Sequence, residues 1–435
     1  MPIQNKEENM LKRLFGEYHL KTELSAGMTV FLAMLYIVPL NALILSQAGM
    51  PYDALITATA LMTVIATAIN AIYARTPIAL SVGMGLNAYF TFGLVKGMGM
   101  EWQSALGIVL VSGILFVILS LTPFRRIAIQ KIPVDVRRSI GAGIGLFLAF
   151  IALKQMGIVV DNPVTLVQLG DLSSSSVLLG LGVTVLLLVL HTMKIKGSFI
   201  IAITVGAVIA WITGMSELPT QLFSMPASIA PIAFQLNFDA FTSLAVIPVV
   251  IAFLVTDIFD SVGTLSGIGG RIFDEDDNTE GEKKLEKTLQ ADSFCSALGS
   301  FFGVSTVTAF VESAAGVEEG GRTGLSTLFT AVLFLLPLFM LPIFSSINPN
   351  AIYPVLIVVG ILMFQDVAKI NFSDFAVVTS SFITITMIPL TFSIATGLAL
   401  GMLTYVIIKA AQKDFKAINI ELIILTLFSS LILFM

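Results

Sequence analysis

The chain has 435 residues, of which 56% are hydrophobic and 12% are charged, and its formal net charge at pH 7 is −5. Soluble domains carry roughly 25% charged residues, so this composition excludes a soluble globular protein. The single cysteine, Cys295, excludes an intramolecular disulfide framework and a thiolate cluster.

Apolar runs long enough to cross a bilayer recur along the whole sequence, which predicts an all-α polytopic membrane protein. The charged N-terminal segment lacks a small-residue cleavage site, so we expect it to be retained in the cytoplasm. Fourteen spans are predicted, near residues 25–46, 53–73, 77–96, 102–122, 138–158, 176–195, 197–214, 242–266, 288–302, 304–318, 322–343, 350–365, 372–388 and 389–411. A further apolar segment, 419–434, is predicted to be either another span or an interfacial helix.

The positions of the basic residues predict the orientation of the chain. With the N-terminus inside, only Lys96 and Lys154 of the 23 Lys and Arg residues fall outside. The cytoplasmic loops then include one dense cluster, Arg125, Arg126, Lys131, Arg137 and Arg138. This asymmetry follows the positive-inside rule and predicts a multi-pass protein of the plasma (cell inner) membrane.

The segment 215–241 has three prolines and no Lys or Arg, so it is predicted to be an external connection between two halves of seven spans. Because seven is odd, the halves have opposite orientations, as in the inverted repeats of secondary transporters. The expected organisation is a cytoplasmic N-terminus (1–24), a first repeat (25–214), the connection, a second repeat (242–411) and a C-terminal apolar segment (412–435).

The third and tenth predicted spans occupy corresponding positions in the two halves, and both are short and interrupted by small residues. Such paired, discontinuous spans are the best sequence indication of a binding site in this architecture. In the third span, Gly83 and Gly85 permit close backbone approach and Asn87 places an amide at depth. Glycines at this spacing are equally suited to helix packing in lipid.

Glu312 lies in the tenth span, where an ionised carboxylate at membrane depth costs at least about 2.5 kcal/mol. Ser305, Thr306 and Thr308 are expected to cap a half-helix that starts inside the membrane and presents free N–H groups and a positive dipole end. A carboxylate beside such donors suits a neutral planar ligand that carries N–H groups, and Phe310 could stack on its ring or simply pack. The alternative is that Glu312 lies in a solvated cytosolic loop.

Asp257 and Asp260 are one helical turn apart in the eighth span and share a face. Two acids so close at depth are not both ionised cheaply, so at least one is expected to exchange protons near neutrality. The alternative is a hydrogen bond to a neighbouring helix. Since His19 and His191 lie near predicted cytoplasmic ends, the expected proton carriers are Asp257, Asp260 and Glu312.

The charged segment 271–287 superficially suggests calcium. An EF-hand that starts at Asp274 would need Gly and Glu where the chain has Thr279 and Leu285, so a solvated loop is expected instead.

Three motifs, VGMGLNAYF (82–90), TDIFDSVGTL (256–265) and STVTAFVESAAGVEEGGRTGL (305–325), resemble those of the AzgA-like purine permeases in the nucleobase cation symporter family. The resemblance implies a core domain of spans 1–4 and 8–11 and a gate domain of spans 5–7 and 12–14. It also implies proton symport of hypoxanthine, guanine or adenine. In the family pattern Asn87, Asp257 and Glu312 bind the base, and Asp260 supports binding or coupling.

The sequence therefore predicts a transporter, not an enzyme, that imports a purine nucleobase with a proton. The predicted substrate-binding residues are Asn87, Asp257, Thr308, Phe310 and Glu312. The expected partners are the base, the proton and lipid, with a homodimer left open and no nucleic acid, cofactor or metal expected. The identity of the purine and sodium in place of the proton are also left open.

Two other functions remain as alternatives. An anion transporter of the sulfate or bicarbonate type shares the architecture but would favour positive charge at the crossing helices. An intramembrane aspartyl enzyme that uses Asp257 would favour paired acids on two facing helices, whereas Asp257 and Asp260 share one helix.

Overall fold

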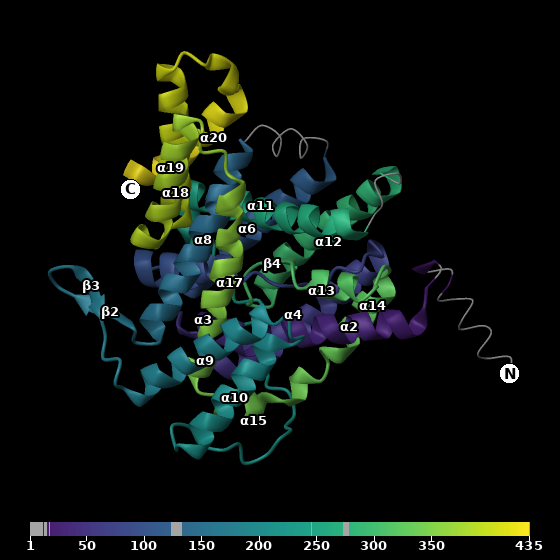
Figure 1. The fold of residues 1–435 in the computed structure, drawn as a ribbon. Helices are drawn as coiled ribbons and strands as arrows, with labels where there is room; N and C mark the ends of the chain where they lie inside the picture. The colour runs from purple at the N-terminus through teal and green to yellow at the C-terminus, as the bar shows by residue number, and fades with distance from the viewer. Residues whose placement is uncertain are drawn as a thin grey trace.

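The computed structural model describes residues 18–122, 133–244, 246–272 and 278–434, together with Lys12, Phe15 and Gly16. Over these residues the chain is almost entirely helical and includes two sheets of two short strands each (Figure 1). Most of the predicted N-terminal segment 1–24 lies outside the described residues, as do Arg125, Arg126 and Lys131.

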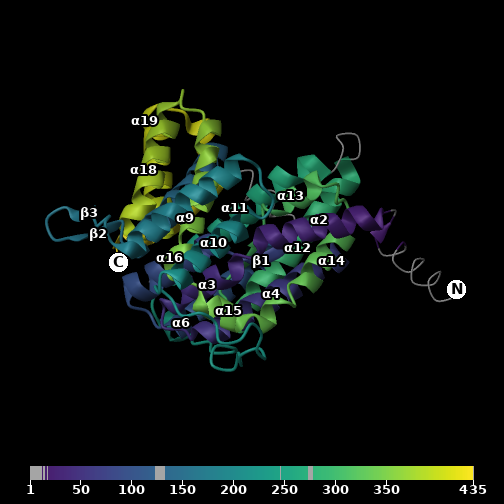
Figure 2. The ribbon, with the colours of Figure 1, turned by 60° about the horizontal axis from the view of Figure 1, so that its bottom comes forward.

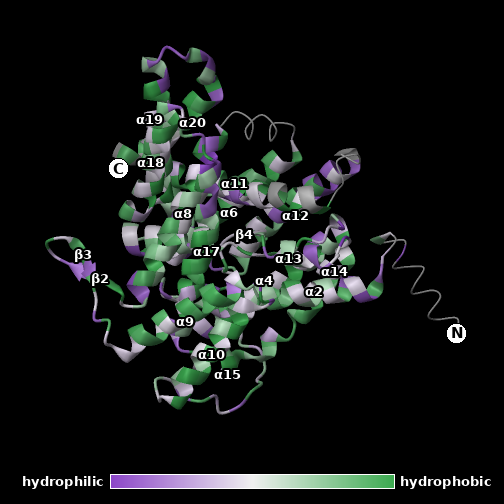
Figure 3. Ribbon diagram, in the orientation of Figure 1, coloured by the Kyte–Doolittle hydropathy of each residue, from purple (hydrophilic) through white to green (hydrophobic). Residues whose placement is uncertain are grey.

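Eight apolar helical segments within the described residues are long enough to cross a membrane. Three shorter apolar helical segments accompany them, at Ser198–Ile212, Gly324–Phe339 and Phe375–Thr391. Hydrophobic residues are frequent along the helices in Figure 3, and many large apolar side chains are exposed, among them Ile212, Phe382 and Leu390. The chain is therefore a multi-pass helical membrane protein, because only lipid accommodates so much outward apolar surface.

The helices of the first half follow the predicted spans closely. α4 (Tyr52–Tyr73), for example, differs from the predicted span 53–73 by one residue. The others are α2 (Leu20–Met34), α3 (Ile37–Ser46), α6 (Trp102–Leu121), α8 (Val134–Gln155), α9 (Ser175–Thr192) and α10 (Ser198–Ile212).

The second half is divided into more helical pieces. Proline stands in the first turn of both α16 and α17, where its missing N–H costs nothing. The Asp374 side chain caps α18 by accepting the Ala376 N–H at 2.9 Å. Apart from α13 (Ser313–Glu318), which belongs to the site described below, the helices in order are α11 (Val246–Ile272), α12 (Asn278–Phe301), α14 (Gly324–Leu333), α15 (Leu341–Ser346), α16 (Pro349–Ile352), α17 (Pro354–Phe364), α18 (Phe375–Thr391), α19 (Ile394–Ala411) and α20 (Ile420–Ser430).

The ninth helix differs from its predicted span. α12 begins at Asn278, ten residues before the predicted start at 288, so most of the segment expected to be a solvated loop is helical. Its charged first turns are compatible with a helix because Glu280 and Lys284 form an i, i+4 ion pair of 2.9 Å. Residues 273–277, where the rejected calcium loop would begin, lie outside the described residues.

The helices pack in two groups. In the first group, α14 packs against α2 and α4, and α12 packs against α6. In the second group, α8 packs against α17 and α18, and α18 packs against α19. Figures 1 and 2 show α18 and α19 standing side by side at one edge, away from α2, α12 and α14. The two groups meet at α11, which packs against α6 and α12 of the first group and contacts α8 and α19 of the second.

Two segments lie outside these groups. Strands β2 (Val159–Asn162) and β3 (Leu166–Leu169) form an exposed hairpin after α8, in which Val159 pairs with Leu169. The predicted external connection is largely irregular apart from the short 3₁₀-helix η2 (Asp239–Thr242). The connection nevertheless reaches the turn before β4, where Ile232 lies against Gly303 and the Phe234 N–H donates to the Phe301 carbonyl at 2.7 Å.

Candidate functional site

The third and tenth predicted spans are both interrupted, as expected, and they meet through backbone hydrogen bonds. β1 (Leu80–Val82) pairs antiparallel with β4 (Val307–Ala309), which places Ser81 opposite Thr308. The Gly83 N–H donates to the Thr306 carbonyl and the Phe310 N–H donates to the Ala79 carbonyl, both at 3.0 Å. The strand pair thus provides hydrogen-bond partners for buried backbone groups that a half-helix leaves without them.

Each strand leads into a short helix. α5 (Met84–Ala88) follows β1 and continues as the π-helical segment η1 (Tyr89–Gly97), and α13 (Ser313–Glu318) follows β4. We call β1 with α5 the first crossing segment and β4 with α13 the second crossing segment. Gly83, directly after β1, allows the two segments to approach closely, because a Cβ there would lie 2.9 Å from the Thr306 hydroxyl.

The expected capping of the tenth span is wrong. Ser305 and Thr306 lie in the buried turn before β4, where Ser305 has a left-handed φ of +63°, and Thr308 lies within the strand. α13 begins only at Ser313 and has no side-chain cap. The Ser313 hydroxyl instead accepts the Ala79 N–H at 3.0 Å and so joins the two crossing segments.

A cavity of about 920 Å³ opens beside the crossing segments. Its buried end is lined by Gly85, Asp260, Thr308 and Phe310, together with Glu312. Its outer end is lined by charged side chains of α8 and of the 3₁₀-helix η5 (Gln365–Lys369), namely Arg137, Arg138, Asp366 and Lys369. The cavity therefore leads from the crossing point to a side of the protein that the charge pattern predicts to be cytoplasmic.

Glu312 lies at the first residue before α13 and faces this cavity. The hydroxyl of Tyr36, a fully buried residue between α2 and α3, donates to Glu312 Oε1. The Tyr36 ring is itself held against Phe199 of α10, with ring centroids 4.7 Å apart. One carboxylate oxygen is thus fixed in place by an ordered donor while the residue still lines the cavity.

The two acids of α11 point in different directions. Asp260 lines the cavity, and the Thr308 hydroxyl is its hydrogen-bond partner. Asp257 does not line the cavity, is 1% exposed, and accepts a 2.5 Å hydrogen bond from Ser296 of α12 on Oδ2. Its Oδ1 has no partner among the described residues. The spacing predicted that both acids share one face and did not separate these two environments.

Asp292 of α12 was missed by the sequence analysis. It is completely buried, and neither carboxylate oxygen has a partner at ordinary hydrogen-bond distance within the described part of the chain, although the Ser261 side chain of α11 lies near enough to stabilise its charge. It interacts electrostatically with Asp257 and, less strongly, with Asp260. The rule that an intramembrane acid marks a functional site would have identified it, since it lies within the predicted span 288–302.

Asn87 is also fully buried, but it lies outside the cavity lining. Its amide donates to Asn41 Oδ1 of α3 at 2.5 Å and to the Val304 carbonyl at 3.2 Å, and its own Oδ1 is left without a partner. Of the two glycines, Gly85 lines the cavity while Gly83 contacts Thr306. The predicted contact of Asn87 with a ligand stays a prediction.

Metal ligation has no counterpart in this arrangement. Among the described residues, no three His, Cys, Asp or Glu side chains are grouped so that they could hold a metal ion. The acids near the crossing segments are instead paired with hydroxyl groups or left without partners.

These features define a class: a multi-pass membrane protein whose polar cavity ends where two interrupted spans cross, which is the arrangement of a secondary transporter. Residues 21–400 match the model of the Permease family, Xan_ur_permease. The chain therefore belongs to this permease family, in agreement with the resemblance to its AzgA-like purine permeases.

Three relatives align over almost their whole length. A protein of Methanocaldococcus jannaschii, named only as a permease, is 43% identical over 92% of both chains. The guanine/hypoxanthine permease PbuO of Bacillus subtilis is 38% identical over 92% of this chain and 94% of its own. The adenine permease AdeQ of Escherichia coli is 35% identical over 96% of this chain and 95% of its own.

A solved structure shares the fold. The transmembrane domain of the cyanobacterial bicarbonate transporter BicA superposes with a TM-score of 0.62 and covers 89% of this chain and 99% of that one. At 16% sequence identity, this similarity concerns the fold alone.

Proposed function

We propose that this transporter imports a purine nucleobase, with a proton, across the plasma membrane, with its N-terminus in the cytoplasm. The observation that carries the proposal is the cavity whose buried end combines the acceptors Glu312 and Asp260 with the Thr308 hydroxyl and the Phe310 ring. The names of the relatives, a guanine/hypoxanthine permease and an adenine permease, support the purine class without selecting one purine.

The chemistry of this end of the cavity suits a neutral heterocycle. Glu312 accepts a ring or exocyclic N–H of the base, while Tyr36 holds the other side of the carboxylate. Thr308 both donates and accepts, so it complements a ring nitrogen or a carbonyl oxygen of a purine. The Phe310 ring, which is 4% exposed, offers a stacking face beside them.

Proton coupling is proposed to use the acids around α11. Asp257, Asp260 and Asp292 interact electrostatically, and Asp257 and Asp292 are shielded from water, so ionising all three at once would be costly. A proton on Asp257 or Asp260, together with the predicted carrier Glu312, neutralises the loaded site. Asp292, with two unpartnered oxygens, extends this set to a fourth acid.

The proposed architecture is two inverted repeats of seven spans each, divided into core and gate domains. The antiparallel pairing of β1 with β4 supports opposite orientations of the two halves. The division of the helices into two packed groups supports a core of spans 1–4 and 8–11 that moves against a gate of spans 5–7 and 12–14. Neutralising the buried acids allows that movement, because an unpaired charge would otherwise be carried through an apolar interface.

An anion transporter has the fold in its favour but not the site. The crossing segments bring carboxylates to the cavity, and its basic side chains lie at the outer end instead. A buried carboxylate beside a bound anion would be destabilising. The charge at the crossing point therefore favours a neutral base.

Uptake by a strain without its own purine permeases tests the proposal. Cells that express the protein should accumulate labelled hypoxanthine, guanine or adenine, and unlabelled purines should compete while uracil and sulfate should not. A protonophore should abolish accumulation. Absence of uptake of all three purines would contradict the purine assignment. Uptake that is insensitive to protonophore and external pH would exclude coupling to a proton.

A further inference from the structure

Arg137 stands out among the charged residues at the outer end of the cavity. Its Nε is buried without a hydrogen-bond partner, and the described residues provide it with no ion pair. Its guanidinium lies over the Phe259 ring, 5.7 Å from the centroid. Phe259 also lines the cavity and is the residue directly before Asp260. A cation whose Nε has no acceptor among the described residues thus stands on the wall that leads to the proposed base site.

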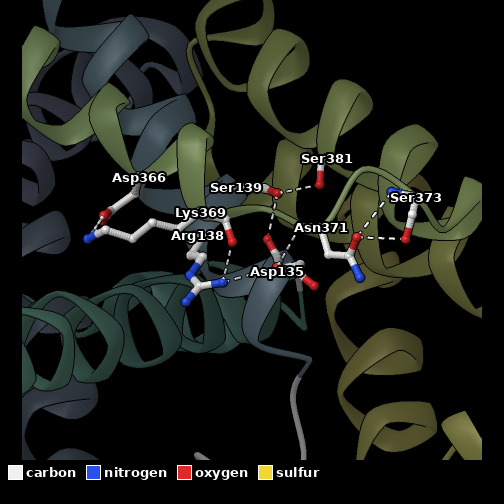
Figure 4. Close-up of polar contacts among 8 residues, drawn as sticks. All are labelled: Asp135, Arg138, Ser139, Asp366, Lys369, Asn371, Ser373 and Ser381. Carbon is white, nitrogen blue, oxygen red and sulfur yellow. Dashed lines mark hydrogen bonds and ion pairs between the residues drawn. The ribbon is translucent and has the colours of Figure 1, made fainter.

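The neighbouring cations are already committed to partners. Arg138 donates to the Lys369 carbonyl at 2.5 Å and to Asp135 at 3.3 Å, and the Lys369 ammonium pairs with Asp366 at 2.8 Å (Figure 4). Asp135 also accepts the Asn371 N–H, so this network ties the start of α8 to the segment before α18. Arg138 and Lys369 therefore hold the edge of the cavity, while the part of the chain that the structure describes offers Arg137 Nε no acceptor.

The size of the cavity also exceeds what a nucleobase needs. About 920 Å³ is near the upper end of the range of roughly 300–1,000 Å³ that accommodates drug-sized ligands. The space continues from Glu312 and Asp260 past Phe259 to Arg137. A larger molecule that ends in an anionic group fits this gradient from acceptors at the buried end to a cation at the outer end.

We propose that Arg137 binds the phosphate of a purine nucleoside 5′-monophosphate that enters from the open side and places its base in the purine site. The guanidinium supplies planar donors that match phosphate oxygens, and stacking on Phe259 fixes the plane in which they point. This inference rests on the proposed purine transport. It adds a second ligand class, recognised by one residue outside the base site.

Such a ligand would inhibit uptake. It binds the conformation in which the cavity is open toward Arg137, and it shifts the population toward that state according to its preference for it. The reaction class that consumes an imported base, ribosyl phosphate transfer, yields this kind of molecule. The transporter would then slow when its downstream product accumulates on the open side.

The test uses the purified full-length protein in detergent and in sealed proteoliposomes. The base is the purine that the wild type is found to take up, and the competitors are its 5′-monophosphate, its nucleoside and ribose 5-phosphate. We expect the monophosphate to displace labelled base at least about tenfold more effectively than the nucleoside, because a hydrogen bond to a charged group is stronger than one between neutral groups. Ribose 5-phosphate alone should compete weakly.

Arg137→Gln should reduce the advantage of the monophosphate to about twofold, with Arg137→Lys intermediate because a point charge replaces the planar fork. Arg138→Gln, a matched loss of charge at the same edge, should retain the advantage. In wild-type proteoliposomes the monophosphate should inhibit only from the side that the charge pattern predicts to be cytoplasmic. This sidedness needs no variant.

Equal competition by monophosphate and nucleoside, unchanged inhibition in Arg137→Gln, or inhibition from the opposite side alone would overturn the proposal. Wild-type uptake of the base in the same vesicles separates these outcomes from failure of the purine assignment, because without uptake it is the proposed function that fails.

Discussion

The two crossing segments occupy equivalent places in the two halves of the chain, yet their polar residues face different surroundings. In the second segment, Glu312 and Thr308 face the cavity. In the first, Asn87 is fully buried and donates to Asn41 and to the Val304 carbonyl. The polar residues of the second segment are thus exposed to a ligand in the cavity, while Asn87 of the first segment stabilises the packing of the crossing segments.

This difference shows that pseudo-symmetric positions need not share a role. The strand pair places the two segments side by side, and Gly85 of the first segment also lines the cavity, but the Asn87 side chain lies outside the lining. A buried polar side chain outside the lining, such as Asn87, must find its partners inside the protein. Four experiments test this division, and they are ordered by the size of the expected effect.

The largest effect is expected from Glu312→Gln. The substitution keeps the shape but removes the charge that accepts from Tyr36 and from the proposed base, so uptake should fall by about 100-fold or more. The measurement is the initial rate of labelled purine uptake, normalised to protein in the membrane. Glu318→Gln, an exposed residue at the end of the same short helix, serves as the control and should remain within about twofold. If Glu312→Gln took up the base at the wild-type rate, the second crossing segment would be excluded from the proposed binding site.

The second-largest effect is expected from substitution of Asp292, the buried acid of α12. Asp292→Asn removes an ionisable group whose two oxygens lack partners and which interacts with Asp257. We expect uptake against a gradient to fall by about tenfold, which is about 1.4 kcal/mol, while exchange of labelled for unlabelled base across the membrane persists. Comparison of the two assays separates coupling from binding. Equal loss of both, with unchanged thermal stability, would place Asp292 in base binding instead.

A smaller effect, mainly on stability, is expected at the first segment. Asn87→Ala leaves Asn41 and the Val304 carbonyl without their donor, which should cost about 1–3 kcal/mol of stability. The midpoint of thermal unfolding in detergent reports this loss, and a double-mutant cycle with Asn41→Ala should show coupling between the two amides. A large rise in KM with an unchanged unfolding midpoint would instead support the predicted contact of Asn87 with the base.

The smallest effect, on stability, is expected at the polar contacts that follow the two crossing segments. After α13, Glu319 pairs with Lys196 from the loop between α9 and α10, whereas Lys96 at the end of η1 donates to Gln47 at 3.0 Å. The hydrogen bond and charge of Lys196 hold the pKa of Glu319 below its ordinary value. A lowered carboxylate pKa stabilises the fold above the ordinary pKa, and this contribution is lost as the pH falls through the folded-state pKa.

Lys196→Gln should therefore lower the unfolding midpoint slightly at neutral pH and not at all below the pKa of Glu319, because exposed ion pairs contribute little. Lys194→Gln in the same loop is the control. A large, pH-independent loss would mean that Lys196 acts through some contact other than Glu319.

Much of the fold could be predicted because it depends on local composition. The apolar run of α4 and the interruption of the third and tenth spans are visible in the sequence alone. The start of α12 was not, because its ion-paired charged turns have the composition of a loop. At the start of α12, helix propensity and an i, i+4 ion pair stabilise a helix even though the residues are polar.

The site was predicted in its residues more than in its geometry. Glu312 and Asp260 follow from the rule that acids are rare at membrane depth, and the same rule applied to the ninth span would have found Asp292. The burial of Asn87 depends on the pairing of β1 with a strand more than 220 residues away in sequence, which no local pattern reveals. Arg137 was counted only as an orientation signal, since its missing partner becomes visible only when the neighbouring residues are placed.

The pairing of β1 with β4 also constrains how the protein is made. When the ribosome has delivered the first crossing segment to the bilayer, Leu80 and Val82 have no strand to pair with until Val307–Ala309 has been synthesised. Their backbone groups must be sheltered from lipid by water or by the insertion machinery during that interval. A nascent chain that stops before the second crossing segment would therefore be a substrate for membrane quality control, however completely its earlier helices have inserted.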